Sequence, residues 1–203
     1  VTGHRTAGIV VGDVRGTVVA DVALLANGLY GLDARGAAGL TVRNARVTDH
    51  GIAGIAVRDC VTCGARIEGG RFEDNAAGII AVAANGILVR GANLHANAVG
   101  IVLRDVDGAH VVGNTLMNND AADVWVAALG DGPEPPTGAG ISISGGRGNV
   151  IASNRISGHT YNVASTGPAP SLEHRVIGNT VGEATHADLG WDGLGVGVCY
   201  RGN

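Results

Sequence analysis

The chain has 203 residues, enough for one domain with a sizeable core, and a formal net charge of −4. This charge provides no basic surface for nucleic acid, and no apolar run is long enough to span a membrane. Glycine supplies 35 residues and aromatic side chains only 3%, so any core must be built from small and branched aliphatic residues.

The first predicted strands lie in residues 8–19, GIVVGDVRGTVV, and this pattern returns about every 22 to 25 residues. Three apolar positions in each repeat define it. The first recurs at Ile9, Leu32, Ile55, Ile79, Ile101, Ile141, Val163 and Leu189. The second recurs at Val19, Val42, Ile67, Val89, Val111, Ile151 and Val176. The third recurs at Leu24, Val47, Phe72, Leu94, Leu116, Ile156 and Val181.

Between these positions, apolar and polar residues alternate in short stretches that are separated by glycine, asparagine or aspartate. Alternation predicts strands with one buried face, and no 3.6-residue periodicity indicates helices. Each repeat can bury its apolar face only against its neighbours, so we expect a coil of short strands that stack in parallel register. A turn position holds Asn27, Asn75, Asn97 and Asn119, with His50 and His159 in the same place, and these side chains are expected to hydrogen-bond along the stack.

These G-I-x-V and N-x-I-x-x-N patterns resemble those of the right-handed parallel β-helix proteins with pectate-lyase-like repeats. The resemblance covers nearly the whole chain and implies a single all-β domain, residues 1–203, of about seven to eight coils and roughly 40 Å in length. It also implies a carbohydrate-active enzyme of the lyase, hydrolase or epimerase type. None of the catalytic motifs of pectate lyases, pectin hydrolases or alginate epimerases is present in full.

Two segments interrupt the repeat. A Pro-rich insertion, residues 127–139, follows Val124 and Trp125, and we expect it to form a wall or lid beside the first strand of the sixth coil. The segment CVTC, Cys60 to Cys63, has half the spacing of a zinc knuckle without a second pair, and a simple turn is the favoured interpretation.

Alternation assigns the residues of the first strands that point outward. One column contains Ala56, Ile80 and Val102, with Trp125 and Ser142 expected to follow, and it is unexpectedly apolar. The next column carries Arg35, Arg58 and Arg104, and Asp59 and Asp105 come directly after it. The apolar column is expected to face a ligand, a partner subunit or the inserted loop.

The best site predicted from this pattern is a groove near the sixth coil. The catalytic candidates are Asp105 and Asp123 as acid or base, Arg104, and His110 as a general base between apolar neighbours. The candidates for substrate binding are Arg58, which can neutralise a carboxylate, together with Trp125, Ile80, Val102 and Glu134. No metal or other cofactor is expected.

Three functions remain open at this point. The resemblance favours a carbohydrate-active enzyme that acts in the groove on an oligosaccharide. The apolar column and the scarce aromatic residues favour a cyclase or isomerase acting on a hydrophobic small molecule in bacterial secondary metabolism. A non-catalytic binding or assembly module, including a homo-oligomer, is the third. No signal peptide is visible, so a cytoplasmic location is expected, or secretion after removal of a signal.

Overall fold

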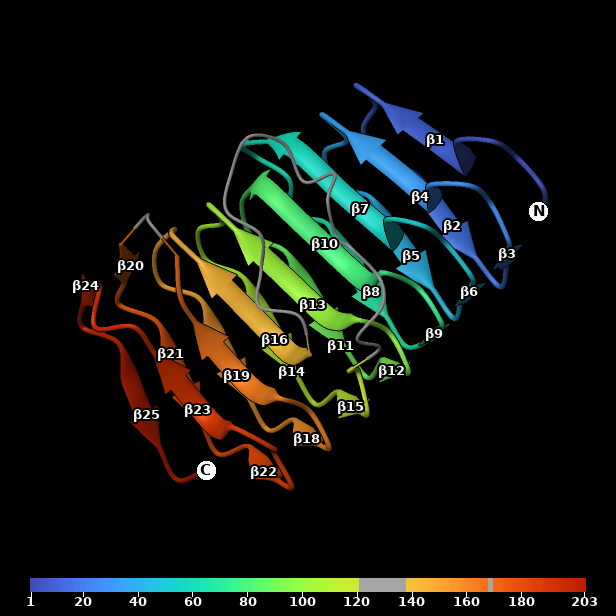
Figure 1. Ribbon diagram of the computed structural model, residues 1–203. Coiled ribbons are helices and arrows are strands. Elements are labelled where there is room, and N and C mark those ends of the chain that lie inside the picture. Colours follow the sequence, from blue (N-terminus) through green and yellow to red (C-terminus); the bar gives the residue numbers. More distant parts are fainter. Residues whose placement is uncertain (121–137, 168–169) are drawn as a thin grey trace.

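The computed structural model describes residues 1–120, 138–167 and 170–203, and these ranges contain strands and turns but no helix. The chain winds into a parallel β-solenoid in which each coil lies over the one before it (Figure 1). The solenoid and all-β predictions are thus confirmed. In the described ranges there is no helix that could cross a membrane.

Three long sheets form the walls of the solenoid. The first sheet contains β1 (Ala7–Gly12), β4 (Tyr30–Arg35), β7 (Ala53–Cys60), β10 (Ala77–Ala84), β13 (Val99–Arg104), β16 (Ala139–Ser144), β19 (Tyr161–Ser165) and β23 (Ala187–Trp191). The second contains β2 (Val18–Ala20), β5 (Thr41–Arg43), β8 (Arg66–Glu68), β11 (Leu88–Arg90), β14 (His110–Val112), β17 (Val150–Ala152), β21 (Arg175–Ile177) and β25 (Cys199–Arg201). The third contains β3 (Ala23–Leu25), β6 (Arg46–Thr48), β9 (Arg71–Glu73), β12 (Asn93–His95), β15 (Thr115–Met117), β18 (Arg155–Ser157) and β22 (Thr180–Gly182). A short fourth sheet pairs β20 (Ser171–Leu172) with β24 (Gly195–Val196).

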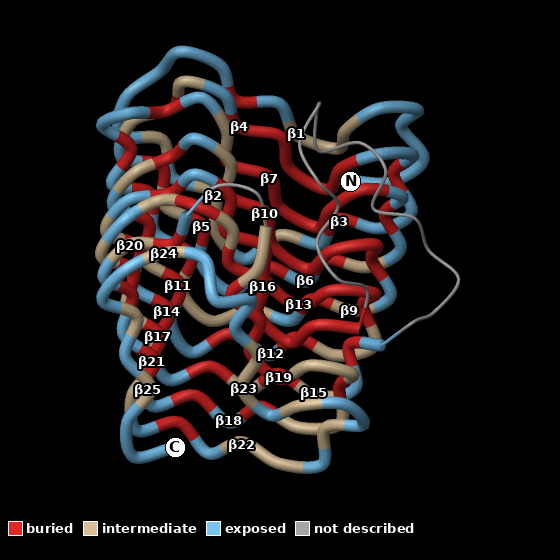
Figure 2. Tube along the Cα trace, turned by 60° about the vertical axis from the view of Figure 1, so that its left-hand side comes forward, coloured by how far each residue is buried: buried red, intermediate tan, exposed pale blue. Residues whose placement is uncertain are grey.

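Strand register places each predicted apolar position directly over its counterpart. Ile55 pairs with Ile79 in the first sheet, for example, and Leu94 pairs with Leu116 in the third. Most of these aliphatic side chains are completely buried in one continuous core inside the solenoid. Figure 2 shows the buried stretches in red, and they recur in successive coils. Because no coil can bury its apolar face alone, the repeated apolar positions require the coils to stack in register.

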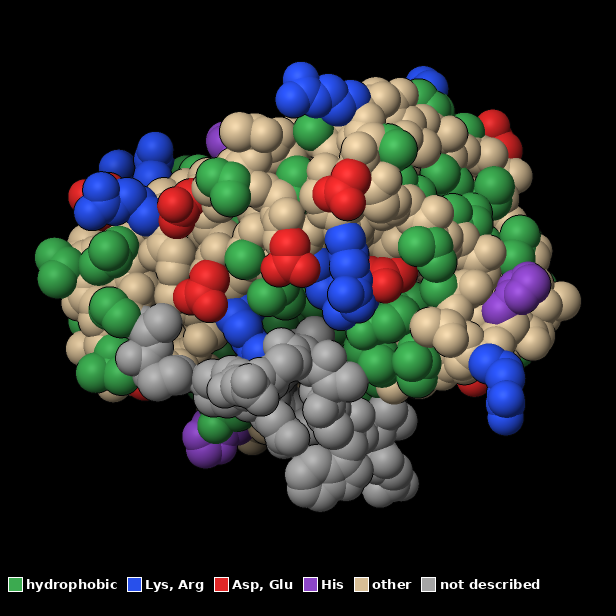
Figure 3. Space-filling model, turned by 90° about the horizontal axis from the view of Figure 1, so that it is seen from above, with side chains coloured by type: hydrophobic (Ala, Val, Ile, Leu, Met, Phe, Trp, Pro, Cys, Tyr) green, Lys and Arg blue, Asp and Glu red, His purple; other side chains and the backbone are tan. Residues whose placement is uncertain are grey.

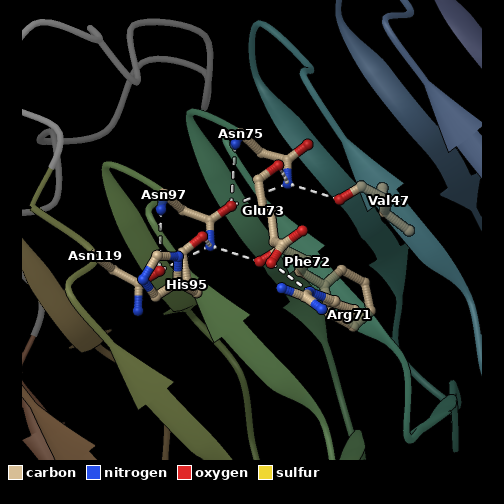
Figure 4. A network of polar contacts seen from close by, with 8 residues as sticks. All are labelled: Val47, Arg71, Phe72, Glu73, Asn75, His95, Asn97 and Asn119. Atoms are coloured by element: carbon tan, nitrogen blue, oxygen red, sulfur yellow. Dashed lines mark hydrogen bonds and ion pairs between the residues drawn. The ribbon is translucent and has the colours of Figure 1, made fainter.

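A ladder of hydrogen-bonded polar side chains runs from coil to coil along the interior corner between the third and first sheets. Asn75 Nδ2 donates to Asn97 Oδ1 at 2.9 Å, and Asn97 Nδ2 donates to Asn119 Oδ1 at 2.7 Å (Figure 4). His50 and His159 extend the ladder, with Nδ1 of His50 at 2.7 Å from Asn75 Oδ1 and Nε2 of His159 at 3.0 Å from Asn119 Nδ2. The predicted role of this column is therefore confirmed.

The turn after β7 differs from the prediction. Cys60 and Cys63 are both buried and form a disulfide, so CVTC is not a plain turn. The two extra residues of this coil, Val61 and Thr62, lie exposed at its apex. Spacing alone could not indicate the bond, because the buried position of Cys63 depends on how the neighbouring coils pack around it.

Candidate active site

On the outer face of the first sheet, charged side chains lie against an aromatic ring. Most of this face is apolar and closely packed: Ala53, Ala56, Ala77, Ile80, Val99 and Val102 belong to a second buried cluster, separate from the core. Ile80 is 0% and Val102 is 2% exposed. The apolar column that favoured a hydrophobic ligand is thus not an open surface.

Two positions on β4 bring polar groups to this face, although Tyr30 is only 5% exposed and is itself a member of the buried cluster. Tyr30 pairs in register with Ala7 and Ala53, and Asp33 pairs with Val10 and Ala56, so a phenol and a carboxylate stand where the neighbouring coils have alanine or valine. Leu32 and Ala34 of the same strand pair with Ile55 and Val57 and belong to the core, whereas Tyr30 and Asp33 lie in the columns of Ala53 and Ala56 on the outer face.

Arg58, on the next coil, joins these two residues into a cluster. Its Nη2 donates to Asp33 Oδ1 at 2.5 Å and its Nε donates to the same oxygen at 3.2 Å. Its guanidinium carbon lies 4.7 Å from the centre of the Tyr30 ring, within the range of a cation–π interaction. Nε of Arg35, a largely exposed side chain, lies 3.5 Å from Asp33 Oδ2. We call Tyr30, Asp33, Arg35 and Arg58 the β4 cluster.

Charge and burial act against each other in the β4 cluster. Burial lowers the pKa of Arg58, but the hydrogen bond and the negative charge of Asp33 outweigh it, and the net shift of the pKa is upward. Asp33 is itself only 7% exposed, and two guanidinium groups approach its two oxygens. The cluster is therefore a fixed cationic centre beside a phenol.

Arg104 lies on the same column as Arg35 and Arg58 but in a different setting. It is 6% exposed, and burial lowers its pKa, with the charge of Asp105 opposing the shift. Asp105 is exposed and has a φ of 50°, and Asp13 and Asp59 adopt the same left-handed conformation in equivalent turns. Aspartate tolerates that conformation, so the turn geometry alone accounts for its presence at these positions.

Acidic and basic side chains are interspersed on the side of the molecule toward which the strands of the first sheet point, seen from above in Figure 3. The described residues at these strand ends include Asp13, Arg35, Arg58, Asp59, Arg104 and Asp105. Arg35 is the most exposed of these three arginine side chains. Within the described ranges, no group of three or more histidine, cysteine, aspartate or glutamate side chains is arranged to hold a metal ion.

The structure brings together only some of the predicted site residues. Arg58, Ile80, Val102, Arg104 and Asp105 share the first sheet or its edge, whereas His110 is exposed on β14 of the second sheet, paired with Leu88 and Val150 as expected.

Three further candidates, Asp123, Trp125 and Glu134, lie outside the described residues, as does most of the Pro-rich insertion. The alternation of apolar and polar residues predicted that Trp125 lies between Val102 and Ser142 in the outer column. Those two residues pair directly with each other, so that placement is wrong.

Tyr30 and Asp33 belong to no recognised catalytic motif, so the sequence pattern did not indicate them as site residues. The available signal was the column itself: in a repeat protein, a polar or aromatic residue where the other coils have alanine marks a candidate position for function. Applied to the two outer columns of the first sheet, this criterion selects Tyr30, Asp33 and, farther along, Ser142 and Tyr161.

The family model for the right-handed β-helix region matches residues 7–181. The chain belongs to the right-handed β-helix family. This membership confirms the handedness and the resemblance seen in the sequence, and it covers all but the first and last parts of the solenoid. No match was found among curated proteins.

Solved structures with the same fold include three epimerases. The A-module of mannuronan C-5 epimerase AlgE6 of Azotobacter vinelandii is 18% identical, with a TM-score of 0.71 over 98% of this chain and 56% of that one. The periplasmic alginate epimerase AlgG is 16% identical, with a TM-score of 0.78 over 96% of this chain and 46% of that one.

The A-module of AlgE4, from the same species as AlgE6, is 15% identical, with a TM-score of 0.67 over 98% of this chain and 58% of that one. The chain thus spans about half the length of these proteins. At these identities the likeness concerns the fold.

Proposed function

We propose that this β-helix acts on an acidic polysaccharide, a polyuronate, and that the β4 cluster is its active centre. The observation that carries the proposal is the contact of Arg58 with both Asp33 and the Tyr30 ring on the outer face of the first sheet. The fold shared with mannuronan and alginate epimerases supports the choice of substrate class.

The chemistry that suits this cluster begins with removal of the proton on the carbon next to a uronate carboxylate. That proton becomes acidic enough only when the carboxylate charge is neutralised, and Arg35 and Arg58 can supply the cations. The phenol of Tyr30 is the candidate proton carrier beside them. Asp33 is a positioning residue, because it holds the Arg58 guanidinium against the ring through two hydrogen bonds.

Hydrolysis fits the cluster less well. Glycosidic hydrolysis commonly uses two carboxylates on opposite sides of the scissile bond. Asp33 is the one carboxylate in the β4 cluster, and both of its oxygens face arginine side chains. Return of the proton from the other side of the sugar ring would make the enzyme an epimerase, and loss of the 4-linked oxygen would make it a lyase.

The test is exchange of that proton with solvent. The protein is incubated with mannuronan and with polygalacturonate in D2O, and deuterium at the carbon next to the carboxylate is followed by NMR, while ultraviolet absorbance reports unsaturated products. Both reactions break the same C–H bond, so the unsaturated product or the deuterium label reveals either outcome. We expect Arg58→Ala and Tyr30→Phe to lower the rate at least a hundredfold, with Arg58→Ala also raising KM.

Arg155→Ala is the matched control, since Arg155 is an exposed arginine on β18 of the third sheet. It is expected to leave the rate unchanged. Absence of exchange and of unsaturated product on both polymers, or equal rates for Arg58→Ala and Arg155→Ala, would show that the β4 cluster is not the active centre of such an enzyme.

A further inference from the structure

A hollow lies on the same face, toward the end of the first sheet that is farther from the β4 cluster. Strands β19 and β23 form its floor, and its volume is about 400 Å³, within the range of pockets that hold small ligands. Its lining includes Tyr161, Thr166, His186, Gly190, Trp191 and Asp192. The β4 cluster lies five strands away from β19 in the first sheet, so the two sites do not share residues.

One side of this pocket is aromatic. The rings of Tyr161 and His186 lie 4.8 Å apart, between centres, with their planes tilted by 58°. Tyr161 pairs in register with Ala139 and Ala187, so it is the second tyrosine that replaces a small residue in this column. A Cβ atom at Gly190 would lie 3.3 Å from the Tyr161 ring, so the glycine allows the ring to lie close against the sheet.

The other side is polar and held in place by the backbone. Asp192 Oδ2 accepts a hydrogen bond from the amide of Gly167 at 2.8 Å, and Oδ1 accepts one from Leu194 at 2.9 Å. Each carboxylate oxygen has a further lone pair for a ligand hydroxyl. Trp191 Nε1 donates to the carbonyl of Leu194 at 3.0 Å, which fixes the half-exposed indole.

We propose that this pocket binds a neutral sugar ring. An aromatic wall suits the apolar face of a pyranose, and an anchored carboxylate with the hydroxyl of Thr166 suits its hydroxyl groups. No arginine is among the residues that line the pocket, and Asp192 would repel a uronate carboxylate. The pocket therefore differs in ligand charge from the β4 cluster, and its assignment does not depend on the reaction proposed there.

The experiment is titration of the protein with three neutral trisaccharides, mannotriose, cellotriose and maltotriose, by calorimetry and by amide NMR. At least one is expected to bind and to shift the amide signals of Thr166, Gly190 and Asp192. Tyr161→Leu is expected to weaken that binding at least tenfold, and Tyr161→Phe to preserve it. Asp192→Asn should weaken it by a smaller factor, since one acceptor oxygen remains.

Controls separate this proposal from the proposed function. Val10→Ala changes an exposed side chain on β1 of the same sheet, and Arg58→Ala removes the β4 cluster; neither should alter binding of the neutral trisaccharide. Folding of each variant is checked by circular dichroism. If none of the three sugars binds, if Tyr161→Leu binds as tightly as the parent, or if trimannuronate occupies this pocket instead, the assignment of a neutral ring is wrong.

Discussion

A glycine at the second position of most first-sheet strands sets how closely successive coils approach. Gly31, Gly54, Gly78, Gly100 and Gly140 form this column, and a Cβ atom at any of them would collide with a backbone oxygen of the next coil. At Gly100 that oxygen belongs to Gly140, and a Leu116 methyl carbon would be 2.8 Å away. The close stacking of coils at this corner therefore depends on the missing side chain.

Gly100→Ala is expected to lower the free energy of unfolding by about 1–3 kcal/mol, the usual cost of forcing extra atoms into a packed interior. Urea unfolding followed by circular dichroism measures it. Gly12→Ala is the matched control, because Gly12 lies on β1 of the same sheet and a Cβ atom there would meet nothing within 4 Å. A Gly100→Ala variant as stable as Gly12→Ala would contradict the packing argument.

At this scale the sequence predicted columns better than it predicted the site. Arg58 and Arg104 were assigned to the outer face from alternation, and strand register agrees. The contact of Arg58 with Tyr30 was not predictable, since it joins residues of different coils and different columns. It depends on side-chain direction, which the period of the repeat does not specify.

At the scale of the structural element, the asparagine ladder links the coils more specifically than apolar packing does. Asn97 accepts from the amide and Nδ2 of Asn75, and it donates to Asn119, to the carbonyl of Phe72 and to that of His95. All of these hydrogen bonds are buried except the one to the His95 carbonyl, which is partly buried. Removal of the Asn97 amide would therefore leave buried polar groups without a hydrogen-bond partner.

Asn97→Ala is expected to lower the free energy of unfolding by about 3 kcal/mol or more, because several buried polar groups would lose their hydrogen bonds at once. The same denaturation experiment measures it. Asn85→Ala provides the comparison: Asn85 accepts one exposed hydrogen bond from the Asp107 amide, and its loss should cost less than about 1 kcal/mol. Equal losses for the two variants would exclude a special role for the ladder.

The strands themselves were predictable because they are stacked in register. Once one coil is aligned, the same three apolar positions identify the strands of all the others, and the ladder residues follow at a fixed offset. The prediction was wrong where the period breaks. Trp125 was placed in the first sheet because Val124 resembled a coil opening, but β13 pairs directly with β16, and local resemblance could not show that.

At the scale of the whole molecule, three fully or nearly fully buried histidines connect folding to pH. His50, His159 and His174 are 2%, 0% and 0% exposed. Burial lowers the pKa of each below the ordinary value of 6.5, although a hydrogen bond and a nearby aspartate oppose the shift in every case. His50 follows β6, His159 follows β18 and His174 precedes β21, so the three lie toward both ends of the stack.

The ladder explains why the neutral form is required. Asn75 Nδ2 already donates to Val47, Glu73 and Asn97, so its Oδ1 faces His50, and His50 Nδ1 must carry the proton. Nε2 of His50 then accepts from Asn27 Nδ2 at 3.1 Å. A second proton on Nε2 would point at an amide that can only donate, and the hydrogen bond would be lost.

The sign of the pH dependence follows from these lowered pKa values. Below about pH 6.5 the histidines of the unfolded chain bind protons, whereas those of the folded chain stay neutral. The free energy of unfolding is therefore highest above that pH and decreases as the pH falls toward the pKa values of the folded state. Urea unfolding between pH 7.5 and pH 5.5 should show a loss of up to about 1.4 kcal/mol per pH unit for each histidine. His50→Asn, which installs the common ladder residue, should reduce this slope, whereas Gly12→Ala, which leaves all three buried histidines in place, should not. A slope that His50→Asn leaves unchanged would mean that the buried ladder histidine accepts a proton without disturbing the fold.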